Sequence, residues 1–482
     1  MRTIRLVAAA LVLAVAAAGC AQQPRLEAAA EAMGAGELTS IQYSGTGTHY
    51  AFGQAYEPGG RWPRFIAKSY SVAADYQTPG LRLEMLRAQG EDPPRGGGAQ
   101  PFAVEQRTIQ VVSGKSAWTE GGQQPAPNPG AVGDRLRALW ATPHGIIKAA
   151  MASGAAADEA GVITLQVEGR EVRATLNEQN HVARVEYLSS NPVVGDYPVE
   201  ITYSDYVQFG NVAFPRRIVQ KEDGFDTLDL TVNDVQPNAP VSLPVPENVR
   251  KVTAPPPVTA QIEKVSPGLW SLVGANTRSL AVEFRDHIVM LEGPTSDARS
   301  AAVNELVRKT IPDKPIRYVV NTHAHYDHAG GLRQYVAEGI TVITHESNRA
   351  FLEKAWARPR TIEPDALSKD PKPVMIEAVG DTHVLTDGSR TVELHYHTGN
   401  GHHTGTLVAW LPRERILMYG DGYNPPAGGE IRTPERGPYY AVQLVELVEQ
   451  QLKLNPVRIA PVHGRLVPYE NLKIAFGIGG TN

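Results

Sequence analysis

The spacing of hydrophobic and polar residues divides the chain into two parts. Over residues 41–238 apolar and polar positions alternate in short runs separated by turn signals, and this period of two predicts a large antiparallel sheet. Over residues 262–482 short apolar runs alternate with segments of helical period, which predicts a layered α/β domain. Residues 239–261 lie between them in a proline-rich stretch that predicts a stiff linker and a domain boundary.

The first part also contains signals that interrupt the strands. A helical insert is predicted over residues 134–151, where Thr142 and Pro143 form an N-cap and first-turn pair. Two stretches rich in glycine and proline, residues 90–101 and 121–133, predict mobile loops.

The candidate chemistry lies in the second part, just after a predicted buried strand at residues 316–320. Four side chains that can bind metals follow within six residues: His323, His325, Asp327 and His328. The first two lie two residues apart in an extended segment, so both imidazoles can reach one ion. The other two lie past the bend and can reach a second point nearby. Neutral imidazole and carboxylate suit zinc, and the carboxyl end of a strand is where open α/β sheets place their sites.

This His-x-His-x-Asp-His sequence after a strand resembles the metallo-β-lactamase superfamily. The other segments that the resemblance requires follow in order, at residues 401–412, 415–421 and 461–464. The resemblance covers residues 262–482 and implies a four-layer αβ/βα sandwich with metals at one edge.

The resemblance also implies two zinc ions about 3.5–4 Å apart, with a bridging hydroxide that attacks the substrate. The implied ligands are His323, His325 and His402 for the first ion, Asp327, His328 and His463 for the second, and the bridging Asp421 for both. Asp327 is also the candidate catalytic residue, because it lies beside the nucleophile and can move its proton.

Three further residues are candidates near the substrate. The distance back from Trp410 and the preceding Gly401 favour His402 over its neighbour His403 as the ligand, so His403 is expected beside the site. Tyr423 and Asn424 follow the bridging acid and are candidate substrate contacts.

Asp421 narrows the reaction class. The zinc β-lactamases typically carry Cys or Ser at that position, whereas hydrolases resembling glyoxalase II and the lactonases carry Asp, so ester, thioester or lactone hydrolysis is favoured. Three alternatives stay open: an enzyme like the mononuclear iron persulfide dioxygenases, a zinc β-lactamase, and a lipid- or partner-binding protein with a secondary metal site. Glu292 stands where many relatives have Asp, so substrates do not transfer directly from well-known members.

Composition bounds the partners. The formal net charge is −5 and no basic run occurs, which argues against nucleic acid; a small-molecule substrate is expected, and the oligomeric state stays open. The single cysteine, Cys20, follows a basic start and an apolar run too short to span a bilayer. Residues 1–20 resemble a bacterial lipoprotein signal, which implies export, lipidation of Cys20 and a place on the periplasmic face of a membrane through that anchor alone; a soluble periplasmic protein is the alternative.

The first domain, residues 21–238, carries its own resemblance. Aromatic and turn positions within residues 203–215 and 235–238 resemble the closing strands of periplasmic lipoprotein-carrier half-barrels. This implies a concave sheet that can hold an acyl chain or a partner; a purely structural spacer is the alternative.

Overall fold

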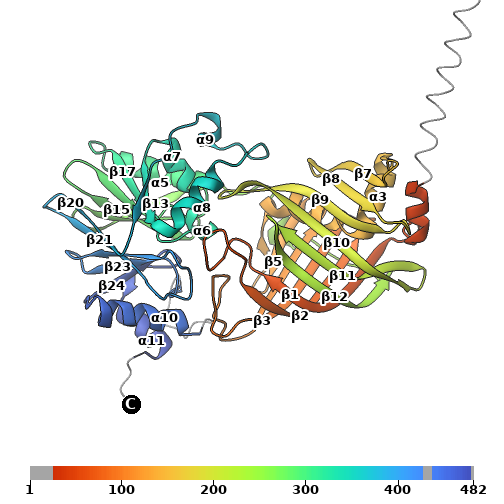
Figure 1. The fold of residues 1–482 in the computed structure, drawn as a ribbon, viewed down its shortest axis with the longest axis horizontal. Coiled ribbons are helices and arrows are strands. Elements are labelled where there is room, and N and C mark those ends of the chain that lie inside the picture. Colours follow the sequence, from red (N-terminus) through yellow and green to blue (C-terminus); the bar gives the residue numbers. More distant parts are fainter. Residues whose placement is uncertain (1–24, 427–436, 479–482) are drawn as a thin grey trace, which may run out of the picture.

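The computed structural model describes residues 25–426 and 437–478. Its first part is built on a twelve-stranded sheet in the order β6-β5-β4-β3-β2-β1-β12-β11-β10-β9-β8-β7, and every paired neighbour is antiparallel (Figure 1). The strands are β1 (Ser40–Tyr50), β2 (Arg64–Asp75), β3 (Gly80–Gln89), β4 (Gln106–Ser113), β5 (Ser116–Glu120), β6 (Ala126–Pro127), β7 (Val162–Val167), β8 (Arg170–Leu176), β9 (Val182–Asn191), β10 (Gly195–Phe209), β11 (Val212–Glu222) and β12 (Phe225–Pro237).

The helical insert of this domain is two helices, α2 (Val132–Trp140) and α3 (Pro143–Ser153), after a short turn η1 (Pro129–Ala131). Thr142 caps α3, because its hydroxyl accepts a hydrogen bond from the Gly145 amide at 3.2 Å. Leu139 and Ile146 are fully buried in the same core as sheet residues such as Leu230. The helices therefore cover one face of the curved sheet.

The proline-rich segment is packed against the first domain. It contains a short helix, α4 (Glu247–Arg250). Val249 is 1% exposed and shares an apolar cluster with Ile109, Val111 and Trp118 of β4 and β5. This contact fixes the path of the chain between the two domains.

The second domain has two sheets, in the orders β13-β14-β15-β16-β17-β18-β19 and β20-β21-β22-β23-β24-β25. The strands are β13 (Ala260–Ser266), β14 (Leu269–Gly274), β15 (Thr277–Glu283), β16 (Ile288–Leu291), β17 (Ile316–Val320), β18 (Thr341–His345), β19 (Ile376–Val379), β20 (Thr382–Thr386), β21 (Thr391–Tyr396), β22 (Leu407–Leu411), β23 (Ile416–Tyr419), β24 (Arg458–Pro461) and β25 (Val467–Pro468). The helices are α5 (Asp297–Thr310), α6 (Tyr326–Ala329), α7 (Leu332–Ala337), α8 (Glu346–Trp356), α9 (Ala366–Lys369), α10 (Tyr439–Val445), the π-helix η2 (Glu446–Gln451) and α11 (Glu470–Phe476).

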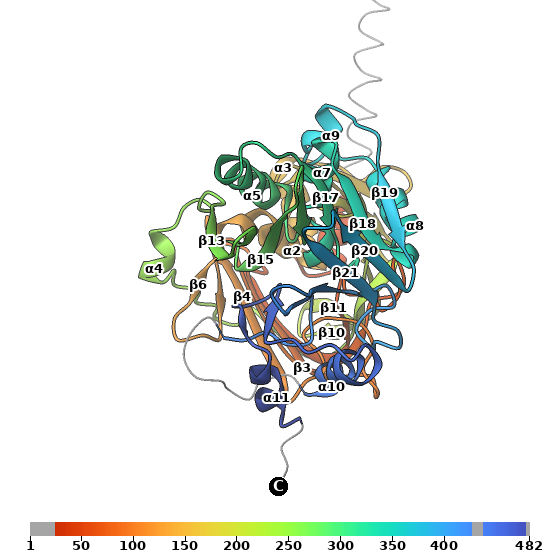
Figure 2. The same ribbon diagram turned by 90° about the vertical axis from the view of Figure 1, so that its left-hand side faces the viewer.

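These elements form four layers. The alternation along β22 shows how the layers are held: Leu407 and Ala409 are buried between the two sheets, whereas Val408 and Trp410 face α10 and α11. Helix α5 covers the outer face of the first sheet through Val303 and its neighbours. Figure 2, which faces this domain, shows α5 and α7 at one end and α10 and α11 at the other, with the sheets between them. The four-layer α/β sandwich preceded by a β domain, as predicted, is confirmed.

Two loops of the first domain lie against the second domain: residues 51–63 between β1 and β2, and residues 90–105 between β3 and β4 (Figure 1). The Tyr326 amide donates to the Gly53 carbonyl at 3.1 Å, and the Gly96 amide donates to the Gly401 carbonyl at 3.0 Å. Composition predicts a mobile loop at residues 90–101, but these contacts hold it in place.

The N-terminal signal and Cys20 lie outside the described residues. Among the helices in the described ranges, none combines the length and the hydrophobicity that crossing a bilayer requires. The lipid anchor stays a prediction.

Candidate metal centre

The turn after β17 positions the first ligands. The Asn321 side-chain amide donates to the His323 carbonyl at 2.7 Å and to the His328 carbonyl at 3.4 Å, so one buried side chain braces both ends of the turn. The glycines that follow allow close packing: a Cβ on Gly331 would lie 2.2 Å from the Ser300 hydroxyl oxygen. Helix α6 begins at Tyr326, six residues after the strand ends at Val320, and its Asp327 and His328 lie at the same edge as His323.

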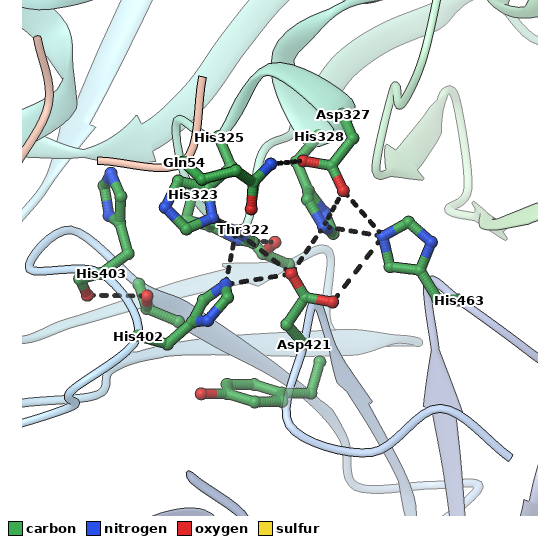
Figure 3. A network of polar contacts seen from close by, with 12 residues as sticks. Gln54, Thr322, His323, His325, Asp327, His328, His402, His403, Asp421 and His463 are labelled. Atoms are coloured by element: carbon green, nitrogen blue, oxygen red, sulfur yellow. Dashed lines mark hydrogen bonds and ion pairs between the residues drawn. The ribbon is translucent and has the colours of Figure 1, made fainter. Parts of the chain in front are cut away.

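A first group of four donors meets at this edge (Figure 3). His323 Nε2 lies 3.0 Å from His325 Nδ1 and 3.3 Å from His402 Nε2. Asp421 Oδ2 lies 3.0 Å from His402 Nε2 and 3.7 Å from His323 Nε2. All four side chains are buried.

A second group shares Asp421 with the first. His463 Nε2 lies 3.1 Å from both His328 Nε2 and Asp327 Oδ2. His328 Nε2 lies 3.2 Å from Asp421 Oδ2, and His463 Nε2 lies 3.7 Å from Asp421 Oδ1. The carboxylate of Asp421 thus stands between the two groups, as a bridging ligand would.

These spacings fit metal ions. Zinc bonds of 2.0–2.2 Å in tetrahedral geometry place neighbouring ligand atoms roughly 3.3–3.6 Å apart. The donor pairs described above are separated by 3.0–3.7 Å, and all the ligand atoms of each group lie within 4.8 Å of one another. The donor set, imidazole nitrogen with carboxylate oxygen, is the one zinc prefers.

The electrostatics of the cluster also favour cations. Burial, with the repulsion of nearby imidazoles, lowers the pKa of His325 to about 3 and the pKa of His323 well below its usual value, so both rings are neutral and free to bind a metal at pH 7. Burial opposes a charge on His328, but Asp327 and Asp421 outweigh it and raise the pKa of that imidazole. The carboxylates of Asp327 and Asp421 therefore strongly favour a positive charge in the space between them.

Hydrogen bonds outside the two groups set which nitrogen of each ring faces the cluster. Glu292 is fully buried, and its Oε2 lies 3.0 Å from His328 Nδ1 while its Oε1 accepts from the Thr322 amide at 2.5 Å. His325 Nε2 lies 2.9 Å from the Ala55 carbonyl oxygen, so this ring donates there and turns Nδ1 to the cluster. Such partners orient metal-binding imidazoles and raise their basicity.

A side chain of the first domain also contacts Asp327, the candidate catalytic acid. Gln54 Nε2 donates to Asp327 Oδ1 at 2.8 Å, and Gln54 Oε1 accepts from the Gly98 amide at 2.9 Å. The other oxygen of Asp327 faces His463 (Figure 3). The β1–β2 loop therefore orients two predicted ligands, Asp327 and His325, across the domain boundary.

A pocket of about 330 Å³ opens over the second group. Asp327, Asp421 and His463 line it together with Gln54 and Arg87 of the first domain. The pocket therefore belongs to both domains.

The structure brings the seven predicted ligands together and separates the other candidates. His402 joins the first group, whereas His403 Nδ1 accepts a hydrogen bond from the Gly405 amide at 2.9 Å and its ring centre lies 5.0 Å from that of His325. Asn424 lines the pocket, and its buried Oδ1 has no hydrogen-bond partner among the described residues. Tyr423 is corrected: it is 4% exposed in the apolar core beside α11 and does not line the pocket.

The residues that the sequence did not reveal are Gln54, Ala55 and Arg87. No local pattern marks them, because they precede the ligands by more than two hundred residues and act through the packing of the domains. In the sequence, Glu292 stands out only because many relatives have Asp at this position, at the end of an early strand. Its contact with His328 is seen only in the structure.

Comparison with known proteins identifies the family. Residues 288–463 match the model of the metallo-beta-lactamase superfamily. This part of the chain belongs to that superfamily, and it carries the histidines and aspartates of a metal-binding cluster.

Individual relatives match part of the chain. The metallo-beta-lactamase type 2 of Bacteroides fragilis is 28% identical over 152 residues, which are 31% of this chain and 53% of that protein. The 2,4-dinitroanisole O-demethylase subunit beta of Nocardioides sp. (strain JS1661) is 32% identical over 102 residues, 21% of this chain and 32% of that protein. A solved metallo-beta-lactamase from Pontibacter korlensis is 16% identical, with a TM-score of 0.34, and covers 46% of this chain and 98% of that one. The chain thus spans about a third to a half of the length of these curated relatives.

Proposed function

We propose that the protein is an exported dinuclear zinc hydrolase that acts on an ester, thioester or lactone. The observation that carries this proposal is the pair of His/Asp groups that share Asp421 at the base of an open pocket. Two ions held this way match the arrangement of two-metal hydrolytic sites.

Zinc bound here would lower the pKa of a bound water to about 7 and polarise the substrate carbonyl. The residues of the chain supply the remaining functions. Asp327 is the only acid of the second group with substantial exposure, at 36%, and one of its oxygens is fixed by Gln54. It is therefore positioned to hold a proton and pass it to the leaving group.

Relatives support hydrolysis without fixing the substrate. One is named a metallo-beta-lactamase and another an O-demethylase subunit, so the family places different reactions on this fold. The aspartate at position 421 favours ester-type substrates over β-lactams, by its resemblance to the glyoxalase II and lactonase branches.

Export and anchoring through Cys20 form part of the same proposal. They rest on the basic start, the short apolar run and the small residues that precede Cys20. Metabolic labelling with a radioactive or clickable fatty acid tests them: wild-type chain becomes labelled in a bacterial membrane fraction and Cys20→Ala does not. Equal labelling of the two would refute lipidation at this residue.

The activity is tested with zinc-loaded protein that begins at residue 21, assayed on chromogenic esters, thioesters, lactones and a cephalosporin. Wild type turns over at least one ester-type substrate, and a chelator removes that activity until zinc returns. Asp327→Asn loses activity by about two to four orders of magnitude if it transfers the proton. Asp381→Asn, in an exposed turn of the same domain, is the matched control and keeps wild-type rates. Full turnover without metal would refute the proposal.

A second candidate function is favoured by a separate cavity. Inside the curved sheet lies a cavity of about 320 Å³ lined by Tyr43, Tyr70, Leu83 and Leu230 among others. Its apolar and phenolic lining suits a lipid chain. Lipid that co-purifies with the protein, together with no turnover on the substrate panel, would favour this binding role over hydrolysis.

A further inference from the structure

Arg87 is placed in the metal pocket by the first domain, although it lies in the sheet and far from the ligands in sequence. It is near the end of β3, and its side chain lines the same pocket as Asp327, Asp421 and His463. The neighbouring loop, residues 90–105, closes this side of the pocket, since Gly98 and Ala99 line it too. A cation therefore lines the same pocket as the metal ligands, where a substrate would lie.

The guanidinium is held rigidly. Its central carbon lies 4.8 Å from the ring centre of Phe65 and 5.2 Å from that of Phe102, and these two rings stack on each other. Its Nη2 donates to the Gly98 carbonyl at 3.1 Å. Stacking on aromatic rings is a frequent way to fix an arginine that recognises an anion.

The hydrogen-bonding capacity of Arg87 is mostly unused. A guanidinium has five N–H donors, and the bond to Gly98 is the one formed within the described residues. Its Nε is buried without a hydrogen-bond partner there, and no described carboxylate pairs with it. Burial lowers the pKa of Arg87 to about 10, so the group still carries its charge at neutral pH. A half-buried, charged guanidinium with most of its donors unused is well suited to bind an anionic group.

We propose that Arg87 forms an anion-binding subsite, so that the substrate carries a carboxylate beside its scissile bond. The inference rests on the proposed hydrolase function and adds the class of substrate. A planar carboxylate can accept two parallel hydrogen bonds from the guanidinium, which would orient the substrate with its carbonyl toward the metal ligands. The first domain would then act as a specificity domain for the second.

The test is a binding measurement that does not depend on turnover. Dicarboxylates from succinate to adipate, and the monocarboxylate of the same chain length for each, are titrated calorimetrically into zinc-loaded wild type. One carboxylate of either probe can bind at the metals, so the ratio of the two Kd values isolates the second carboxylate. Wild type is expected to bind at least one dicarboxylate about tenfold more tightly than its monocarboxylate.

Substitutions test whether Arg87 causes the difference between the two Kd values. Arg87→Met is expected to bring the ratio to about one while the Kd of the monocarboxylate stays unchanged, and Arg87→Lys to keep part of it. Arg82→Met, on the same strand but paired with Glu84 at 2.7 Å outside the pocket, is the matched control and keeps the wild-type ratio. If Arg87→Met folds poorly, the Arg87→Lys ratio decides: a full wild-type ratio with the shorter, non-planar cation contradicts a bidentate site.

Three further results would overturn the inference. They are a wild-type ratio near one, binding of neither probe, and an equal loss of both probes in Arg87→Met, which would show a structural role only. Absence of turnover on the ester panel refutes the hydrolase instead and leaves the binding ratio readable, so the two failures are distinguishable.

Discussion

Replacement of Glu292 by glutamine tests how the second metal group is oriented. The carboxylate accepts two hydrogen bonds, one from the Thr322 amide and one from the His328 ring. An amide keeps the shape of the side chain but has one acceptor oxygen in place of two. If its NH₂ faces Thr322, a buried N–H loses its partner. If it faces His328, that ring must keep its proton on Nε2, the nitrogen that faces Asp421.

Either outcome carries a defined penalty. A buried donor without a partner costs about 1–3 kcal/mol, and the loss of a partner to a metal-binding imidazole typically costs about 10–100-fold in metal affinity. Because His328 belongs to the second group only, this loss should fall on one ion. Glu292→Gln is therefore expected to weaken one zinc by about 10–100-fold and leave the other near its wild-type affinity.

The assay is competition with a chromophoric zinc chelator, which resolves two stoichiometric steps. Glu393→Gln is the matched control, because Glu393 also contacts a histidine, His395 at 3.3 Å, but on β21 away from the pocket. Unchanged affinity at both steps in Glu292→Gln, or equal losses at both, would refute the reasoning.

Three further changes have expected outcomes. Gln54→Ala removes the amide that holds Asp327 and should lower kcat/KM by about 10–100-fold with a normal far-ultraviolet spectrum; wild-type kinetics would refute the role of the β1–β2 loop. Burial lowers the pKa of the His144 imidazole to about 4, whereas the ring of the unfolded chain titrates near 6.5. The neutral buried ring therefore makes its full contribution to the free energy of unfolding above about pH 6.5, and this contribution is lost as the pH falls to 4. The difference amounts to roughly 3 kcal/mol. The free energy of unfolding of His144→Asn, measured in urea, should therefore change less between pH 7 and 4.5 than that of wild type, and an identical pH dependence in the two proteins would contradict this. Removal of zinc should lower the Tm of the second domain, because an ion present at 100 times its Kd adds about 2.7 kcal/mol; an unchanged Tm would show that no ion binds the folded state.

The fold of both domains followed from the period of the apolar residues. Strand β17 has the predicted bounds, because its apolar positions face a core that fixes them. Short edge strands such as β6 and β25, each of two residues, escaped prediction because too few positions alternate. The π-helical turn over Glu446–Gln451 also lacks a local signal, since its pattern is that of an ordinary helix.

The candidate site was predictable where ligands follow strands, and it was not where the domains meet. His323 to His328 form one turn, and the resemblance to the metallo-β-lactamase superfamily pointed to His402, Asp421 and His463 in the later segments. The partners from the first domain depend on a separation of 270 residues between Ala55 and His325. Nothing in the alternation of β1 and β2 distinguishes a loop that reaches a metal site from one exposed to solvent.

The most direct test of the account is the metal content of the chain beginning at residue 21, purified without added metal and measured by plasma mass spectrometry. Two zinc ions per chain are predicted, with loss of at least one in a variant that lacks the shared Asp421. About one iron per chain would contradict the zinc hydrolase and favour sulfur oxidation. No metal, even after zinc is supplied, would show that these seven side chains do not form a working centre.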